Sequence, residues 1–591
     1  MSVDSNPNSE NQASLSPIPS KWKPLRIWPL IILLAGMVVF RLLPSLVEDG
    51  PANIWMSAAF GPALCGILIL IWWLVASRAT MWERIVGFLG IIASLILTLV
   101  LLAPSMRGPA VTVMTIPTGM AAFAIGAILS HRLLSFKRTI ISLLMTAAAF
   151  GVSTLFRTDG MWGNFALGLH PRWSKSSEDL ISADSQSRKV KTTTNDFSDA
   201  LTHPEWPGFR GPHRDGVQHG PTLATDWITT PPKLIWKIPV GSGWSSFAVA
   251  GQMLFTQEQR GAFETVVCYA ADSGLEIWTR QVESRFDDPL GGPGPRATPT
   301  LADGALYVMG ATGLLLRLDP LTGEIVWKQD LKVVANRQPP MWGFSSSPLV
   351  VGSLVIVHAA GSGDKGIVAF NTDDGQLQWS AAASEGSYSS PELATINDTS
   401  LVLMMTKNGI DFLDPATGAS RFFYEWQSEG YRACQPQQIG DDSLLIPTGM
   451  GAGTRRIRIP HDHNAWKADE VWTSRNLKPD FNDLVIFEGH AYGFDAAIFS
   501  CINLETGQRT WKGGRYGKGQ VLLQSESGLL IVMGEQGELV LLKADPKSLT
   551  ELSRFQAISG KTWNHPVLIG DRLYVRNAQE AACYQLPLTQ K

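Results

Sequence analysis

The sequence predicts two domains of different fold: an N-terminal α-helical transmembrane bundle of about five helices, then an all-β eight-bladed β-propeller. Three observations predict this. One stretch of the chain is largely apolar, the rest is punctuated by Gly, Asp and Trp, and that second part repeats itself about every 40–50 residues. At 591 residues the chain is also too long for one ordinary domain. We expect a cytoplasmic N-terminal tail at 1–24, the bundle at 25–157, a polar linker at 158–205 and the propeller at 206–591.

Five apolar stretches predict the helical bundle, at roughly 26–43, 54–76, 85–103, 110–130 and 139–156. Each is near the length of about 20 residues that crosses the hydrocarbon core of a membrane. The first stretch is similar to a signal peptide, but it lacks a small-residue cleavage site and four more stretches follow it. We therefore expect the first stretch to be retained as a span.

Loop charges predict the orientation of the bundle. Positive residues precede the first span and follow the second and fourth spans, whereas the loop after the first span carries Glu48 and Asp49 and no Lys or Arg. This alternation places the N-terminus inside, and five crossings place the propeller outside. We expect a multi-pass protein of the inner (cytoplasmic) membrane with a periplasmic propeller. The lipid bilayer is then one partner. The spans carry almost no buried ionisable residue, which favours an anchor over a transporter.

The propeller repeat has a turn half and an inner-strand half. The turn half follows the pattern Asp-x-x-Gly-x-x-x-Trp with some variation in spacing, and its copies run from Asp272 to Trp278, Asp319 to Trp327, Asp373 to Trp379, Asp414 to Gly418 and Asn503 to Trp511. Asp, Asn and Gly suit a tight turn, and we expect the Trp that follows to begin an outer strand and to wedge between neighbouring sheets. The inner-strand half has a polar lead-in and eight copies, at 245–249, 297–301, 346–350, 389–393, 434–438, 481–485, 519–523 and 564–568.

Eight inner strands predict eight blades, and the chain offers a way to close the ring. Leu234–Ile238 reads as an outer strand without a blade before it, and the last blade supplies only three strands. We expect the early strand to complete the last blade, which leaves no open sheet edge. Cys268, Cys501 and Cys583 occupy one position of the repeat, so they lie in different blades and are predicted to be unbonded core residues.

Asp-x-x-Thr-Gly-x-x-x-Trp blades in an eight-bladed ring resemble the PQQ-like β-propellers. That superfamily includes quinoprotein alcohol and glucose dehydrogenases and a non-enzymatic lipoprotein of outer-membrane β-barrel assembly. The resemblance covers residues 206–591 and implies the fold strongly and the function weakly. The chain also looks like uncharacterised membrane-anchored bacterial members. It departs from alcohol-type quinoproteins in lacking their adjacent cysteines, and the calcium ligands that accompany the cofactor cannot be placed residue by residue.

The segments that lead into the inner strands carry more polar and aromatic residues than a scaffold requires. If they meet at one mouth of the channel, their cations, carboxylates and rings would suit a small anionic or carbonyl-rich ligand. Each residue also has a structural reading, as a capping, ion-paired or packed side chain. The candidate binding residues are Trp244, Ser246, Glu258, Arg260, Arg296, Trp342, Asn482, Asp483, Arg515, Lys518, Gln520, Asn564 and His565, with Asp483 and His565 as candidate catalytic residues and no metal ligand.

Two functions remain open on these observations. The first is a non-catalytic envelope module that binds another envelope protein through the propeller. The second is a quinoprotein-type dehydrogenase that oxidises an alcohol or sugar with PQQ and calcium and passes electrons to membrane quinone. A ligand sensor is a third reading, but the sequence shows no recognisable cytoplasmic output domain. The formal net charge of −3 gives no basic footprint for nucleic acid.

Overall fold

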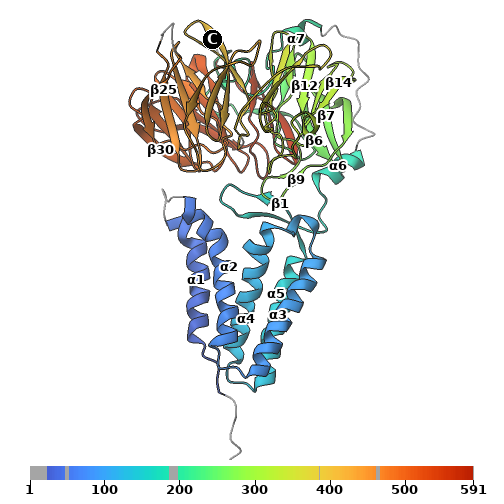
Figure 1. Cartoon of the computed structure of the whole chain (residues 1–591), viewed down its shortest axis with the longest axis vertical. Helices are drawn as coiled ribbons and strands as arrows, with labels where there is room; N and C mark the ends of the chain where they lie inside the picture. The colour runs from blue at the N-terminus through green and yellow to red at the C-terminus, as the bar shows by residue number, and fades with distance from the viewer. Residues whose placement is uncertain (1–22, 47–51, 185–197, 385, 461–465, 590–591) are drawn as a thin grey trace, which may run out of the picture. The chain divides into compact units, whose positions relative to one another are not determined.

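The computed structural model describes residues 23–46, 52–184, 198–384, 386–460 and 466–589. The chain divides into two compact units, Met1–Arg157 and Thr158–Lys591. The first is helical and the second is almost entirely β (Figure 1). Both predicted fold classes are therefore confirmed. The expected N-terminal tail and the acidic loop of Glu48 and Asp49 lie outside the described residues, apart from the end of the tail.

The helical unit consists of α1 (Trp28–Leu46), α2 (Ala52–Val75), α3 (Met81–Leu101), a short 3-10 helix (Pro104–Met106), a π-helical turn (Val111–Thr115) that runs into α4 (Ile116–Ser130), and α5 (Ser135–Ser153). Four of these segments are long and apolar enough to cross a membrane: Ile54–Val75, Met81–Leu101, Val111–Ser130 and Ser135–Ser153. The helix α1 carries a shorter apolar segment, Trp28–Pro44. The number of spans by this measure is four to five, in line with the prediction.

The helical unit contains a buried ion pair that the expectation of nearly charge-free spans did not include. The side chains of Glu83 on α3 and Arg138 on α5 are fully or almost fully buried, and two Arg138 nitrogens donate to the two Glu83 oxygens at 2.6 and 2.8 Å. The Glu83 side chain also accepts from the backbone N–H of Thr80, whose hydroxyl caps α3 in return. The pair joins two helices near their N-terminal ends, outside the mid-span positions where a charge is visible in a hydrophobic stretch.

The stretch 158–205 was expected to be a polar linker. In the structure, β1 (Phe156–Met161) and β2 (Leu167–Pro171) form a hairpin, and α6 (Ser177–Asp184) and α7 (Ser198–Thr202) follow. Residues 185–197 of the expected linker lie outside the described residues.

The propeller has eight blades of four antiparallel strands, and blade 7 carries β3 (Val217–Gln218) as a fifth (Figure 1). From the inner to the outer strand, blades 1 to 4 are β5 (Ala248–Ala250), β6 (Met253–Arg260), β7 (Phe263–Ala270), β8 (Glu276–Glu283); β11 (Thr300–Ala302), β12 (Ala305–Met309), β13 (Leu314–Leu318), β14 (Ile325–Asp330); β15 (Leu349–Val351), β16 (Leu354–His358), β17 (Ile367–Asn371), β18 (Leu377–Ala381); and β19 (Glu392–Ile396), β20 (Thr399–Thr406), β21 (Gly409–Leu413), β22 (Ser420–Glu425).

Blades 5 to 8 are β23 (Gln437–Ile439), β24 (Ser443–Thr448), β25 (Gly453–Arg458), β26 (Asp469–Ser474); β27 (Val485–Phe487), β28 (His490–Asp495), β29 (Ile498–Asn503), β30 (Arg509–Arg515); β31 (Gln520–Gln524), β32 (Leu529–Met533), β33 (Glu538–Lys543), β34 (Thr550–Gln556); and β35 (Val567–Ile569), β36 (Arg572–Arg576), β37 (Glu580–Gln585), β4 (Lys233–Pro239). The smaller elements are β9 (Asp287–Asp288), β10 (Gly292–Pro293), α8 (Leu331–Val334) and a 3-10 turn (Ser525–Ser527).

The ring closes as predicted, because the early strand β4 pairs antiparallel with β37 and places Trp236 opposite Cys583. Cys268 and Cys501 likewise lie opposite the tryptophans of their outer strands, and all five cysteines are buried and unbonded. These cysteines therefore act as small apolar residues.

The repeated Trp and Gly of the turn motif fit together across blades. A Cβ added to Gly323 would lie 2.4 Å from the indole of Trp278 in the preceding blade, and the Trp278 Nε1 donates to the carbonyl of Pro320 at 2.9 Å. The same Trp-on-Gly packing recurs for Trp236, Trp327, Trp379 and Trp472. The core clusters accordingly contain residues from neighbouring blades. The wedge prediction is thus confirmed, and Gly is required because a side chain there would displace the indole.

Candidate functional site

The candidate residues are scattered along the chain, yet antiparallel topology brings them to one end of the ring. In every blade the start of the inner strand, the turn between the second and third strands, and the end of the outer strand lie at the same end. We call this end the lead-in face. It includes Arg260 at the end of β6, Arg515 at the end of β30, and the eight lead-ins themselves. The lead-in segments therefore meet at one end of the ring, as the sequence predicts.

The lead-in residues form a closed ring of hydrogen bonds from blade to blade. Backbone N–H groups of one blade donate to side chains of the next, or side-chain amides donate to carbonyls of the neighbour. In order from blade 1, the links are Ser246 N to Thr298 Oγ1 (3.0 Å), Thr298 N to Ser347 Oγ (3.0 Å), Ser347 N to Ser390 Oγ (2.9 Å), Gln435 Nε2 to Ser390 O (3.2 Å), Gln435 N to Asp483 Oδ1 (3.0 Å), Asn482 Nδ2 to Gly519 O, Gln520 Nε2 to Trp563 O (2.9 Å) and Asn564 Nδ2 to Ser245 O (2.7 Å).

This ring gives many of the candidate residues a structural task. Ser246 also donates to the carbonyl of His565 at 2.7 Å, so blades 8 and 1 are joined twice. The carboxamide oxygens of Gln435, Asn482, Gln520 and Asn564 are nevertheless buried and accept no hydrogen bond within the part of the chain that the structure describes. The ring is therefore stabilising, and it retains acceptors for water or a small ligand.

A segment that the sequence analysis did not single out crosses the channel. We call residues 206–218 the axial strap. Its first residue, Trp206, pairs with Val249 of β5, and its last two pair in parallel with β31 in blade 7. Between these ends, Arg214 donates to the carbonyls of Pro348 and Pro391, in blades 3 and 4. Because inner strands line the axis of a propeller, a segment bonded to so many of them fills the axis.

Arg210 and Arg214 of the strap meet three titratable groups of the ring. Arg210 donates to the Leu484 carbonyl at 2.5 Å, and its Nη1 lies 3.5 Å from the Asp483 carboxylate, while His565 Nε2 lies 3.4 Å from the other oxygen of Asp483. Glu392 at the start of β19 is buried in the field of both arginines. Together these residues, Arg210, Arg214, Glu392, Asp483 and His565, form an axial cluster.

Burial and charge set the protonation of the axial cluster. Burial raises the pKa of Glu392 well above its usual range despite the two arginines, which favours the neutral acid. Burial also favours the neutral acid of Asp483, but the Arg210 charge and the His565 contact outweigh it and hold the pKa of Asp483 below its usual value. Burial lowers the pKa of His565, although Asp483 opposes this. The favoured state at neutral pH is a charged Asp483–Arg210 pair beside neutral His565 and Glu392.

The β1–β2 hairpin lies on one half of the lead-in face. The Met161 N–H donates to Leu290 O at 2.7 Å, and the Gly163 N–H donates to Glu535 Oε1 at 2.6 Å. Lys561, which precedes the lead-in of blade 8, donates to the carbonyls of Asp159 and Met161 at 3.0 and 3.1 Å. This covered half therefore involves blades 7 and 8 and the connection between blades 1 and 2.

Trp244 lies beneath that hairpin, in a cluster that holds Lys561. The rings of Trp244 and Trp563 pack on each other at 4.7 Å, and the Lys561 ammonium lies 5.1 and 4.7 Å from their centroids. Burial lowers the pKa of Lys561 to about 8, while the charges of Asp159 and Glu535 oppose this. Trp244 is thus engaged with Trp563 and Lys561 rather than presented to a flat ligand.

Glu258, Arg260 and Arg296 have partners of their own. Arg260 pairs with Glu258 at 2.9 Å and with Glu276 at 2.8 Å. Burial favours the neutral acid, but the charges of Arg260 and Arg576 hold the pKa of Glu258 below its usual value. Arg296 pairs with Asp288 of β9. The structure thus gives Glu258 and Asp483 separate partners, whereas the sequence analysis expected them to converge.

Trp342 and Arg515 lie away from the hairpin, whereas Lys518 lies beside the hairpin tip at Gly163. Trp342 contacts Tyr431 and Tyr388 with ring centroids 4.4 and 5.0 Å apart. Lys518 pairs with Asp480, and Arg515 is exposed at the end of β30. Trp342 and Lys518 come from loops between blades, and Arg515 is the last residue of β30.

The resemblance to quinoproteins implies a flat quinone and a calcium ion, and the residues of this chain do not fit that pair well. Calcium needs several oxygen ligands at one point. Among the described residues no group of three or more His, Cys, Asp or Glu side chains is placed to hold a metal. Asp483 is bonded to Arg210 and to the N–H of Gln435, and the axial strap occupies the channel.

Comparison with known proteins agrees with this architecture. The family PQQ_2, described as outer membrane protein assembly factor BamB, matches residues 227–339 and 262–429, all within the propeller. The matched residues contain blades 1 to 4 and the closing strand β4, so this part of the propeller resembles the PQQ-like family. None of the curated proteins compared with the sequence matches it.

Solved structures that are similar to this propeller have low sequence identity to it. BamB from Moraxella catarrhalis is 16% identical over 60% of this chain and 100% of its own, with a TM-score of 0.44. Quinohemoprotein alcohol dehydrogenase from Comamonas testosteroni is 12% identical over 70% of this chain and 85% of its own, with a TM-score of 0.46.

Proposed function

We propose that this protein is an envelope interaction module: a PQQ-like propeller, held at the inner membrane by its helices, that binds another envelope protein without catalysing a reaction. One observation carries the proposal. The axial strap fills the channel with Arg210 and Arg214, and the lead-in side chains are bonded from blade to blade. A ring closed in this way leaves its outer surfaces for recognition.

The periplasmic placement of the propeller is part of the proposal. It rests on the alternation of positive charge between loops, with Lys21, Lys23 and Arg26 before the first span and Arg132, Lys137 and Arg138 after the fourth. Arg138 is paired with Glu83 in the structure, so it contributes less to the positive charge that sets the orientation than Arg132 and Lys137 do. The inner membrane follows from the same argument.

A quinoprotein-type dehydrogenase is the second candidate function. The observation that favours it is the axial cluster, because buried Asp483 and His565 lie 3.4 Å apart and several buried oxygens around them have no partner among the described residues. Buried titratable groups of this kind also occur in catalytic sites. Oxidation of an alcohol or sugar with PQQ and calcium is the reaction that this reading implies.

One experiment separates the two candidates. Purified full-length protein in detergent is titrated with PQQ in the presence of calcium chloride, and cofactor absorbance and dye reduction with alcohols and sugars are followed. The module predicts neither saturable binding nor dye reduction. Saturable absorbance together with turnover would overturn it. In parallel, a photo-crosslinking residue at exposed Met341, with exposed Ile228 as the control position, is expected to capture one recurrent envelope protein from Met341 only.

A further inference from the structure

The half of the lead-in face without the hairpin combines an aromatic cluster with a basic cluster. The aromatic part consists of Trp342, Tyr388 and Tyr431, flanked by Met341 and Met450, which are 69% and 49% exposed. Large exposed apolar side chains beside aromatic rings are typical of contact surfaces. These five residues come from four separate turns of blades 2 to 5, so the ring brings them together.

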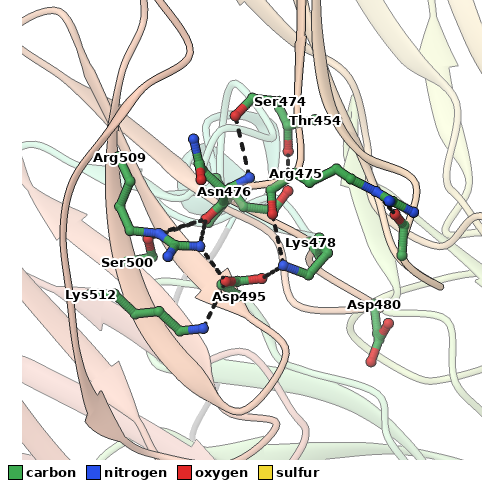
Figure 2. A network of polar contacts seen from close by, with 12 residues as sticks. Thr454, Ser474, Arg475, Asn476, Lys478, Asp480, Asp495, Ser500, Arg509 and Lys512 are labelled. Atoms are coloured by element: carbon green, nitrogen blue, oxygen red, sulfur yellow. Dashed lines mark hydrogen bonds and ion pairs between the residues drawn. The ribbon is translucent and has the colours of Figure 1, made fainter. Parts of the chain in front are cut away.

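The basic part gathers around a single carboxylate in blade 6. Lys478, Arg509 and Lys512 all point toward the fully buried Asp495 (Figure 2). The Arg509 Nη2 and Lys512 Nζ atoms lie 2.7 and 2.9 Å from the carboxylate, and Lys478 also contacts it. One negative charge thus orients three positive ones, whose side chains remain 13–28% exposed.

Two exposed arginines extend this positive region. Arg475 donates to the Gly451 carbonyl at 3.0 Å, and Arg515 ends β30 opposite Ile498, three residues beyond Asp495. Asp480 beside this region is paired with Lys518, and exposed Glu429 lies on the aromatic side. The five basic side chains thus outnumber these acids and Asp495, although the whole chain has a formal net charge of −3.

The two parts are contiguous. A Cβ at Gly430, the residue before Tyr431, would lie 2.6 Å from Met450 Cγ, and the Met450 N–H donates to Asp480 at 3.3 Å. Gly451, next to Met450, accepts the bond from Arg475. Met450 therefore links the rings to the cations. We call this surface, with its five aromatic-side and five basic residues, the open patch.

We infer that the open patch binds an acidic segment of a partner protein, in which carboxylates lie close to an aromatic or aliphatic side chain. The carboxylates fit the cations around Asp495, and the apolar side chain fits the rings beside Met341 and Met450. A phosphate-rich ligand without apolar groups would leave the aromatic part unused. This inference rests on the proposed interaction function and specifies its partner chemistry.

The test uses the full-length protein in detergent and a fluorescein-labelled twelve-residue peptide of six glutamates, two phenylalanines and four glycines, with binding followed by anisotropy. We expect saturable binding that weakens as salt rises. Exchange of the phenylalanines for alanine should weaken it about five-fold or more. The double variant Arg475→Glu/Arg515→Glu should weaken it about ten-fold or more, whereas the matched reversal Arg458→Glu/Lys467→Glu should not.

Several results would overturn the inference. These are no saturable binding of the peptide, equal loss in both double variants, or equal binding of a polyphosphate chain and the peptide. Thermal unfolding of each variant must match that of the parent protein, and Trp342→Phe should retain the affinity that Trp342→Ala loses. If the peptide does not bind while crosslinking from Met341 still captures a protein, the inferred acidic partner segment is wrong and the proposed interaction function stands. If Met341 captures nothing, the interaction function itself fails.

Discussion

The two halves of the lead-in face are built on the same repeat and differ in what lies on them. On the covered half the hairpin bonds to Lys561 and Glu535, and Trp244 is packed beneath it. On the open half Met341 and Met450 are exposed beside rings and cations. The lead-in ring of hydrogen bonds runs under both halves. The comparison teaches that the repeat supplies the support, while segments outside the repeat decide which part of the face stays exposed.

The largest effect is expected when the Arg210–Asp483 ion pair, which lies beneath both halves, is removed. Arg210→Met leaves the carboxylate of Asp483 buried without its cation, which should lower the free energy of unfolding by about 3–5 kcal/mol. Thermal unfolding of the full-length chain in detergent, followed by tryptophan fluorescence, measures the loss. The double variant Arg210→Met/Asp483→Asn should recover much of it. An unchanged melting temperature in the single variant would show that the strap does not hold the ring.

The covered half should have its own pH dependence. Lys561 has a pKa of about 8 when folded and an ordinary value of 10.5. Between these values the unfolded chain binds more protons, so the stability of the protein should rise with pH from about 8 to 10.5, by about 3 kcal/mol in total. Denaturant unfolding at stepped pH measures this rise. Lys561→Met should remove it, and the same rise in that variant would assign it to another group.

A smaller effect is expected when the hairpin alone is displaced. A Cβ at Gly163 would lie 2.0 Å from Lys518 Cγ and 2.9 Å from Glu535 Oε1, so Gly163→Val should detach the hairpin tip at a cost of about 1–3 kcal/mol. Limited proteolysis should then cleave within β1–β2 much faster than in the parent protein. Ala166→Val, at an exposed position of the same hairpin, is the control. Equal protection in Gly163→Val would mean that the hairpin is not held by these contacts.

The repeated parts of this fold were predictable because each prediction rested on many copies of one pattern. Eight lead-ins gave the blade number, and the unmatched strand before blade 1 gave the closure through β4. The tryptophan wedge followed from the Asp-x-x-Gly turn. Local patterns of this kind agree with the global fold, which is why they could be read without a structure.

The contacts that decide the site could not be read in the same way. Arg210 and Arg214 bond to backbone carbonyls more than 130 residues away, and any residue type supplies a carbonyl. The hairpin has no periodic pattern, and Glu83 and Arg138 meet across 55 residues of sequence. One signal was present: Arg210 to Gly216 is dense in Gly and Arg without a strand pattern. Such a segment before the first blade indicates a structural or functional insertion.

The central claim, that recognition lies on the open half and not at the axis, is tested most directly by the yield of the Met341 crosslink in two variants. Asp483→Asn alters the axial cluster, and Trp342→Ala alters the open patch. With both variants folded in membranes, we predict that Asp483→Asn retains the captured protein and that Trp342→Ala loses most of it. Loss in Asp483→Asn together with full capture by Trp342→Ala would contradict the account.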